Sequence, residues 1–253
     1  MFVYEKSNLR VAEVFFDEPA RPVAADIIRF HHRSNPVAHA RCAGQQTLWI
    51  DLSANPDAIL AAMNTDTRYK IRRAAKDGAV YEFQALPDAT WVKEFSEFYD
   101  RFALDKGLPP ANRKRLAAML EHGALDLSRM RGPDGEVLIW HAHLLGHDRA
   151  RLLHSASLFR ELDKNAAAAV GRANRMCHWE DIQRFKGEGL ATFDFGGWYG
   201  GTGDAAKLRI NEFKRGFGGT VVAQYNADCA GTWKGAAALC LRTAVRAIRR
   251  LED

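Results

Sequence analysis

Residues 190–220 decide the fold, and they read LATFDFGGWYGGTGDAAKLRINEFKRGFGGT. Residues 190–195 are short and rich in β-branched and aromatic side chains, which predicts a strand that stops at Gly196 and Gly197. A loop rich in Gly, Trp and Tyr follows. The apolar spacing of residues 204–215 then predicts a helix that also carries several basic side chains. Gly218 and Gly219 break the chain before a second strand at residues 221–225.

The two glycine motifs, DFGG at residues 194–197 and FKRGFGG at residues 213–219, resemble the pattern of the Fem family of aminoacyl transferases. This family belongs to the GNAT acyltransferase superfamily, and many of its members transfer amino acids from aminoacyl-tRNA to a free amine. The resemblance covers mainly residues 67–225. It implies an acyltransferase that takes aminoacyl-tRNA as co-substrate and needs no bound cofactor, and it places the family's catalytic lysine at Lys214.

Composition indicates an ordinary soluble globular protein, with 47% hydrophobic and 26% charged residues among 253. The net charge of +5 and the pI near 9.1 permit a polyanionic partner without requiring one. The four cysteines form no CxxC pair, so we expect neither structural zinc nor a disulfide framework. Without a signal-peptide pattern or an apolar run of bilayer length, we expect a cytoplasmic protein with no integral membrane contact.

Periodicity and turn residues across residues 80–225 predict the element order β-α-α-β-β-β-α-β-α-β, which is that of the GNAT fold. We therefore expect an α/β (mixed α+β) protein in which helices flank a central mixed, mostly antiparallel sheet. Full-length Fem enzymes have two GNAT-like halves, whereas this sequence suggests one complete and one reduced half. The predicted division is a reduced N-terminal portion at residues 1–79 and a complete domain at residues 80–253.

Two helices are strongly basic. Residues 67–76 form the first, and the resemblance implies that its Lys70, Arg72 and Arg73 lie near a phosphate-bearing substrate. The second, at residues 233–251, sets an apolar stripe against a row of arginines. Both basic faces have the alternative of being simply solvated. As an RNA-binding surface, the second helix would bind tRNA through Arg242, Arg246 and Arg249.

Acyl transfer to an amine requires a route for the amine proton and stabilisation of the developing oxyanion. In GNAT-type folds the acyl donor lies where two parallel central strands part, here residues 151–158 and 190–195. The predicted catalytic residues are Lys214, Asp194, His154 and Ser155. Lys214 would stabilise the tetrahedral intermediate, and Asp194 would either accept a proton or order the glycine loop. The predicted substrate-binding residues near these strand ends are Gly196, Gly197, Trp198 and Tyr199.

His141 and His143 alternate on one strand and so share a face. We include both among the substrate-binding residues, and one of them is a candidate general base. Together with His154 they could form a three-histidine zinc site, but we favour a site without metal. The strand is expected to be half exposed, and no carboxylate is apparent in the sequence to orient the imidazoles.

The stretch LFRELDKNAAAA before the third predicted helix of this half lacks the glycine turn with which acyl-CoA-using GNAT enzymes bind pyrophosphate. The leading hypothesis is therefore an aminoacyl-tRNA-dependent N-acyltransferase acting on a small-molecule or polysaccharide amine. The first alternative is an acyl-CoA-dependent N-acyltransferase. The second is a non-catalytic RNA-binding module on a degenerate transferase fold.

Overall fold

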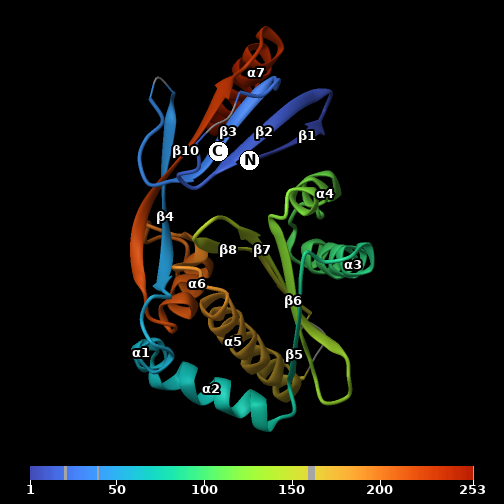
Figure 1. The fold of residues 1–253 in the computed structure, drawn as a ribbon, viewed down its shortest axis with the longest axis vertical. Helices are drawn as coiled ribbons and strands as arrows, with labels where there is room; N and C mark the ends of the chain where they lie inside the picture. Colours follow the sequence, from blue (N-terminus) through green and yellow to red (C-terminus); the bar gives the residue numbers. More distant parts are fainter. Residues whose placement is uncertain (20–21, 39, 159–162, 253) are drawn as a thin grey trace. The chain divides into compact units, whose positions relative to one another are not determined.

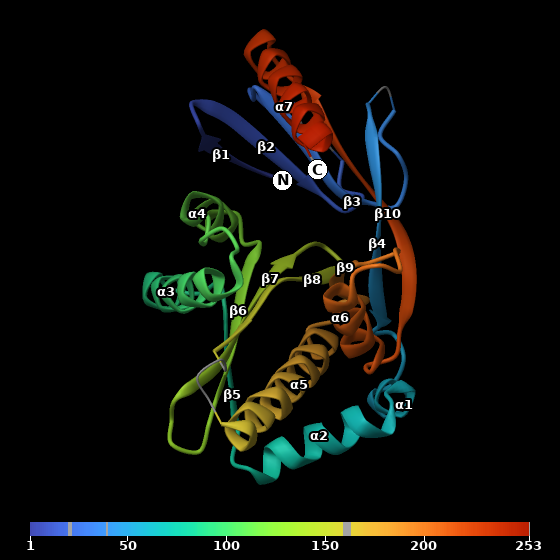
Figure 2. The same cartoon turned by 180° about the vertical axis from the view of Figure 1, so that it is seen from behind.

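The computed structural model describes residues 1–19, 22–38, 40–158 and 163–252, with side chains as far as residue 243. The chain forms two compact units, one of residues 1–45 with 223–253 and the other of residues 46–222. It passes between them within β4 (Cys42–Asp51) and again within β10 (Thr220–Ala230). Figures 1 and 2 show the elements from opposite sides.

The larger unit contains a mixed sheet with the strand order β4-β9-β8-β7-β6-β5. After β4, its elements are α1 (Pro56–Ala62), α2 (Thr65–Lys76), β5 (Val80–Ala85), α3 (Ala89–Lys106), α4 (Arg113–Glu121), β6 (Leu125–Arg131), β7 (Val137–Leu145), β8 (Arg149–Ser157), α5 (Lys164–Gly187), β9 (Thr192–Trp198) and α6 (Ala205–Arg215). Neighbouring strands run antiparallel except β8 and β9, which are parallel. The predicted GNAT-like element order and mostly antiparallel mixed sheet are confirmed.

Helices cover both faces of this sheet. Helix α5 runs along one face, and α3 and α4 lie on the other (Figures 1 and 2). The apolar periodicity of α3 buries Phe95, Phe98 and Tyr99. On the α5 face, Phe185 packs with aromatic side chains of β9 in the main core cluster. Strands between two helical layers are buried on both faces, and this places polar side chains of the central strands in the protein interior.

Asparagine and aspartate caps determine where several helices begin. The Asn64 side chain accepts a hydrogen bond from the Thr67 N–H at 2.7 Å, at the start of α2. Asp163 accepts from the N–H groups of Asn165 and Ala166 at the start of α5. Each cap of this kind typically contributes about 1 kcal/mol, because it satisfies N–H groups that the helix itself leaves without partners.

Strand β9 does not stop at the glycines, contrary to the prediction. It continues through Gly196 and Gly197, and Gly197 pairs with Thr47 of β4. The register between β4 and β9 shifts just before that pair, and Gly196 has a φ of +77°. Gly196 adopts this left-handed conformation without a Cβ clash, so the strand forms a bulge and then resumes pairing.

The smaller unit has the strand order β1-β2-β3-β10 and contains the C-terminal helix. Its elements besides β10 are β1 (Phe2–Lys6), β2 (Leu9–Phe15), β3 (Ile27–Arg33) and α7 (Trp233–Glu252). The predicted division at residue 79 follows a different boundary from these compact units and stays a prediction. Among the described residues, no helix has both the length and the apolar character needed to cross a bilayer.

Candidate active site

The two parallel strands of the sheet part toward their C-terminal ends. Their pairing covers three register positions, from Arg149 with Thr192 to Arg151 with Asp194. Both strands then continue, β8 to Ser157 and β9 to Trp198. Past the last pair, residues 152–157 of β8 and 195–198 of β9 are not paired with each other. This is the pair of strands that the sequence predicted for the acyl donor.

Asp194 lies buried at the point where the strands part. Its carboxylate accepts hydrogen bonds from the Arg151 guanidinium at 2.5 Å, the Gly196 N–H at 2.8 Å and the Thr47 hydroxyl. Arg151 and Thr47 come from β8 and β4, which flank β9. The geometry is that of a carboxylate that orders the glycine bulge, one of the two roles predicted for Asp194. Sequence reasoning missed both partners, since they lie far from the glycine motifs.

Lys214 joins the two glycine motifs. From the last turn of α6, its Nζ donates hydrogen bonds to the carbonyls of Gly197 at 2.5 Å and Gly196 at 3.2 Å. Burial lowers the pKa of Lys214 to about 8, with a further lowering by Arg151 and an opposing effect of Asp194. An ammonium group has three hydrogens. Two of them reach these carbonyls, and one remains for another acceptor.

The loop after the bulge is held by α6. The Asn211 side chain accepts from the Tyr199 N–H at 3.1 Å and donates to the Tyr199 carbonyl at 2.7 Å. The Arg215 guanidinium lies 5.0 Å from the ring centre of Trp198. The two aromatic residues predicted to bind substrate are thus fixed directly beyond the bulge. Asn211 was missed, because a single asparagine within a helical pattern carries no distinguishing signal.

His154 and Ser155, both predicted to be catalytic, lie on opposite faces of the sheet. The His154 ring centre is 4.4 Å from that of Tyr99 on the α3 side. Burial, aided by Arg115, lowers the pKa of His154 to about 4. Ser155 faces α5, where its Oγ donates to Asn174 Oδ1 at 3.3 Å. The two neighbours cannot therefore act on one substrate from the same side, and the catalytic role of each stays a prediction.

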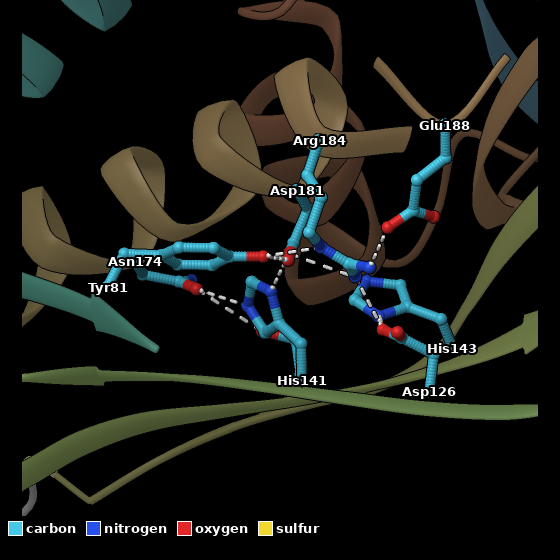
Figure 3. Close-up of polar contacts among 9 residues, drawn as sticks. Tyr81, Asp126, His141, His143, Asn174, Asp181, Arg184 and Glu188 are labelled. Carbon is cyan, nitrogen blue, oxygen red and sulfur yellow. Dashed lines mark hydrogen bonds and ion pairs between the residues drawn. The ribbon is translucent and has the colours of Figure 1, made fainter. Parts of the chain in front are cut away.

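Beneath α5 lies a buried layer of polar side chains (Figure 3). The Nδ1 of His141 is 2.6 Å from Asp181 Oδ2, and its Nε2 is 3.0 Å from Asn174 Oδ1. The Tyr81 hydroxyl donates to Asp181 Oδ1 at 2.7 Å. Burial alone would raise the pKa of Asp181, but His143 and His141 lower it well below its ordinary value. His141 therefore lies beside an ionised carboxylate.

His143 shares this layer, with Nδ1 3.2 Å from Asp126 Oδ1 and Nε2 3.4 Å from Asp181 Oδ2. Burial opposes its charged form, yet Asp181 and Asp126 together raise the pKa of His143. Arg184 donates to Asp126 at 2.6 Å. Two predictions were wrong here: the strand is buried rather than half exposed, and Asp181 and Asp126 are the orienting carboxylates. A signal was present in α5, where Asn174, Cys177 and Asp181 follow helical spacing along one face.

The zinc site considered for His141, His143 and His154 does not form, because His154 lies on the other face. A different group, His141, Cys177 and Asp181, has donor atoms within 4.8 Å of one another and could hold a metal ion. Its atoms are already engaged, since the Asp181 carboxylate contacts Tyr81 and His141 at hydrogen-bond distance. Burial also raises the pKa of the Cys177 thiol well above its ordinary value, which disfavours the thiolate that a metal would bind.

The predicted basic residues occupy several surfaces. On α2, Lys70 pairs with Asp66 and Arg73 with Asp77, each at 2.8 Å, while Arg72 is exposed. In the smaller unit, Arg242 pairs with Asp228 of β10. Arg246 and Arg249 lie outside the residues whose side chains are described. Their roles in binding RNA stay predictions.

A mixed sheet whose two parallel strands part beside a glycine bulge and a half-buried lysine is the arrangement of a GNAT-type fold. The sequence itself matches the family described as "Acetyltransferase (GNAT) domain" over residues 61–215, more than half of the chain. The protein belongs to this family. A search of curated protein sequences gives no match.

Several solved structures share the fold at low sequence identity. FemX has 14% identity and a TM-score of 0.59, over 72% of this chain and 61% of its own. The C-terminal domain of a putative lysylphosphatidylglycerol synthetase from Agrobacterium fabrum has 15% identity and a TM-score of 0.56, over 87% and 71%. L-PGS from Bacillus licheniformis has 12% identity and a TM-score of 0.54, over 95% and 88%. The predicted Fem-like resemblance is thus confirmed at the level of fold, although the chain spans less than two thirds of FemX.

Proposed function

We propose that the protein transfers an aminoacyl group from aminoacyl-tRNA to an amine acceptor. The observation that carries this choice of donor is the start of α5, where GNAT enzymes that use acyl-CoA bind pyrophosphate. Here the Asp163 carboxylate accepts from the Asn165 and Ala166 N–H groups at 2.7 and 2.9 Å. These two N–H groups at the start of the helix are already occupied, and the occupying group is itself an anion that would repel a pyrophosphate.

The proposed chemistry runs through a tetrahedral intermediate at the parted ends of β8 and β9. The acceptor nitrogen attacks the ester carbonyl of the donor, and the carbonyl oxygen becomes an oxyanion. Lys214 Nζ, anchored on the Gly196 and Gly197 carbonyls, supplies its third hydrogen to that oxygen. Collapse of the intermediate breaks the bond to the tRNA hydroxyl and leaves an amide. Asp194 and Arg151 contribute by holding the bulge on which the lysine is anchored.

The name of one structural neighbour and the Fem resemblance point to different acceptors. A lysylphosphatidylglycerol synthetase is named for a lipid product, whereas the resemblance to the Fem family points to an amine. We favour the amine, and a lipid hydroxyl is included in the test because Lys214 would stabilise the oxyanion from either nucleophile. The tRNA itself would be bound by Lys70, Arg72 and Arg73, with Arg242, Arg246 and Arg249 as a second surface.

Transfer of radiolabel tests the donor directly. A pool of charged tRNA and, in parallel, acetyl-CoA are offered with a mixture of amines and with phosphatidylglycerol vesicles. We expect label to move from tRNA, and Lys214→Ala to reduce the rate roughly 10²–10³-fold, as for loss of one oxyanion donor. Lys207→Ala is the matched control, because this lysine of the same helix is exposed and paired with Asp204 at 2.9 Å.

The second candidate function is acyl-CoA-dependent transfer, which is favoured by the description of the matched family as an acetyltransferase domain. Label moving only from acetyl-CoA would overturn the tRNA proposal and support this one. CoA thioesters would then also protect the protein against thermal unfolding. Retained RNA binding without turnover from either donor would contradict both.

A further inference from the structure

We propose that His141 is the proton acceptor of the acyl transfer, that Asp181 positions it, and that Ser155 connects it to the attacking amine. This inference rests on the proposed acyl transfer and identifies its base. The reaction must remove a proton from the nucleophile as the new bond forms. At the glycine bulge, Arg151, Thr47 and the Gly196 N–H engage the Asp194 carboxylate, and Lys214 donates to two carbonyls.

Asp181 determines which ring nitrogen of His141 is left for proton transfer. Its Oδ2 is 2.6 Å from Nδ1, and its other oxygen is held by the Tyr81 hydroxyl at 2.7 Å. With Nδ1–H donating to this carboxylate, Nε2 is the nitrogen that gains or loses a proton. Nε2 meets Asn174 Oδ1 at 3.0 Å. The imidazole thus lies between two oxygens, which stabilise the ring when both nitrogens carry a proton (Figure 3). For Nε2 to accept a proton, the Asn174 side chain turns so that its oxygen no longer faces the ring.

Ser155 connects this buried ring to the parted strands. It stands directly opposite His141 in the β7–β8 register, where Cβ atoms are typically about 4.5–5.5 Å apart. Its Oγ contacts the same Asn174 oxygen as Nε2, at 3.3 Å. Ser155 and Asn174 are partly exposed, whereas His141 and Asp181 are fully buried. Ser155 also lies beyond Arg151, the last residue of β8 that pairs with β9. The hydroxyl therefore shares the Asn174 oxygen with Nε2 and lies on the stretch of β8 past its pairing with β9.

The other two imidazoles of the layer are not placed for this role. His143 has carboxylates near both ring nitrogens, Asp126 and Asp181. His178 stacks on His141 with ring centres 4.1 Å apart and is otherwise surrounded by phenylalanine rings. The titratable and charged groups around the His141–Asp181 pair are Tyr81 from β5, Asp126 from β6, His143 from β7, and Cys177, His178, Glu180 and Arg184 from α5. Lys214 from α6 acts on His178.

Each proton that moves in the reaction is accounted for without any further reactant. The Ser155 hydroxyl turns from Asn174 to Nε2 and gives up its proton while it takes one from the amine, and the carbon–nitrogen bond forms. The imidazolium then returns its proton through Ser155 to the departing tRNA oxygen as the carbon–oxygen bond breaks. Both side chains end in their starting states.

The test is the pH profile of kcat/KM for transfer from whichever donor the labelling experiment identifies. We expect His141→Gln to lower kcat/KM roughly 10²–10⁴-fold, the usual contribution of a general base, and to abolish the acidic limb of the profile. Ser155→Ala should lower it at least about tenfold with the limb retained. His178→Gln is the matched control: it removes an imidazole from the same buried layer and should leave both the rate and the limb within a few-fold. An acidic limb that persists in His141→Gln would overturn the proposal.

Two further measurements distinguish the proposed His141–Asp181 pair from a metal site and from failure of the tRNA chemistry. The proton on His141 Nδ1 should give a downfield NMR resonance that disappears in Asp181→Asn, and its absence from the wild-type protein would overturn the pairing independently of activity. Stoichiometric zinc in the purified protein that is lost in His141→Gln would also overturn the proposal and assign a metal site to His141, Cys177 and Asp181. Failure of the proposed tRNA chemistry looks different, since wild-type protein would then transfer nothing from charged tRNA.

Discussion

The glycine bulge and the histidine layer are both buried and polar, yet they are built in opposite ways. At the bulge, Arg151 and Lys214 hold Asp194 and two backbone carbonyls, so the charges fix the path of the chain. In the histidine layer, imidazoles face carboxylates, and the side-chain atoms Asp126 Oδ2 and His178 Nδ1 have no hydrogen-bond partner among the residues that the structure describes. One region is held mainly by permanently charged groups, and the other is built from imidazoles and carboxylates.

The difference follows from the chemistry of the groups. Guanidinium and carboxylate ions keep their charge through the neutral range, and a buried pair of them persists only with good geometry. Imidazoles change charge in that range. The two regions should therefore respond differently to mutation and to pH, and four experiments test this.

The largest effect should come from Asp194→Ala, because it leaves the Arg151 guanidinium buried without its carboxylate. We expect the free energy of unfolding to fall by roughly 3–5 kcal/mol in urea denaturation. The exposed pair of Lys70 with Asp66 provides the control, and Asp66→Ala should cost less than about 1 kcal/mol. Equal losses in the two variants would show that the bulge does not depend on its buried ion pair.

The second effect is a rise of stability with pH that originates at Lys214. Its pKa is lowered to about 8 in the folded protein and is 10.5 ordinarily. Between these values the unfolded chain holds a proton that the folded chain lacks, so stability increases as pH rises. The difference in unfolding free energy between wild type and Lys214→Met should grow from about pH 8 to pH 10.5. No such growth is expected for Lys207→Met, and a flat difference for Lys214→Met would contradict its burial.

The third effect distinguishes the two glycines of the bulge. Gly196 has a φ of +77°, and an added Cβ would lie 3.2 Å from the Leu152 carbonyl oxygen. Gly196→Ala should therefore destabilise the protein by roughly 1–2 kcal/mol. Gly197→Ala is the control, since an added Cβ there meets nothing within 4 Å. Thermal unfolding of both variants measures the difference, and similar melting temperatures would argue against the bulge.

The smallest effect should come from His143, because burial and the two carboxylates act on its pKa in opposite directions. Its pKa is raised above 6.5, so its contribution is present below that pH and is lost as pH rises through the higher folded value. The stability difference between wild type and His143→Gln should thus shrink as pH rises, opposite to the trend for Lys214. A difference that instead grew with pH would show that His143 is neutral in the fold.

Much of the fold and the glycine motifs could be predicted from the sequence alone. The GNAT-like element order came from periodicity and turn residues, and the two glycine motifs are local; the parallel pair β8 and β9 and the role of Lys214 were implied by the resemblance that these motifs carry. These features are readable because each depends on residues near one another in the chain. The prediction that β9 stops at Gly196 was wrong for a related reason: local preference marks a glycine as a break, and only pairing with β4 shows that the strand resumes.

Tertiary structure decided which polar groups meet. Asp194 lies 43 residues from Arg151, and His141 lies 40 residues from Asp181. No local pattern specifies such pairs, because they depend on strand register and on the face that α5 presents to the sheet. The opposite placement of His154 and Ser155 is an intermediate case: alternation along a strand predicts opposite faces, but only the packed helices show that one face carries Tyr99 and the other Asn174. Local sequence thus determined the elements and the glycine motif, and long-range packing determined the chemistry around them.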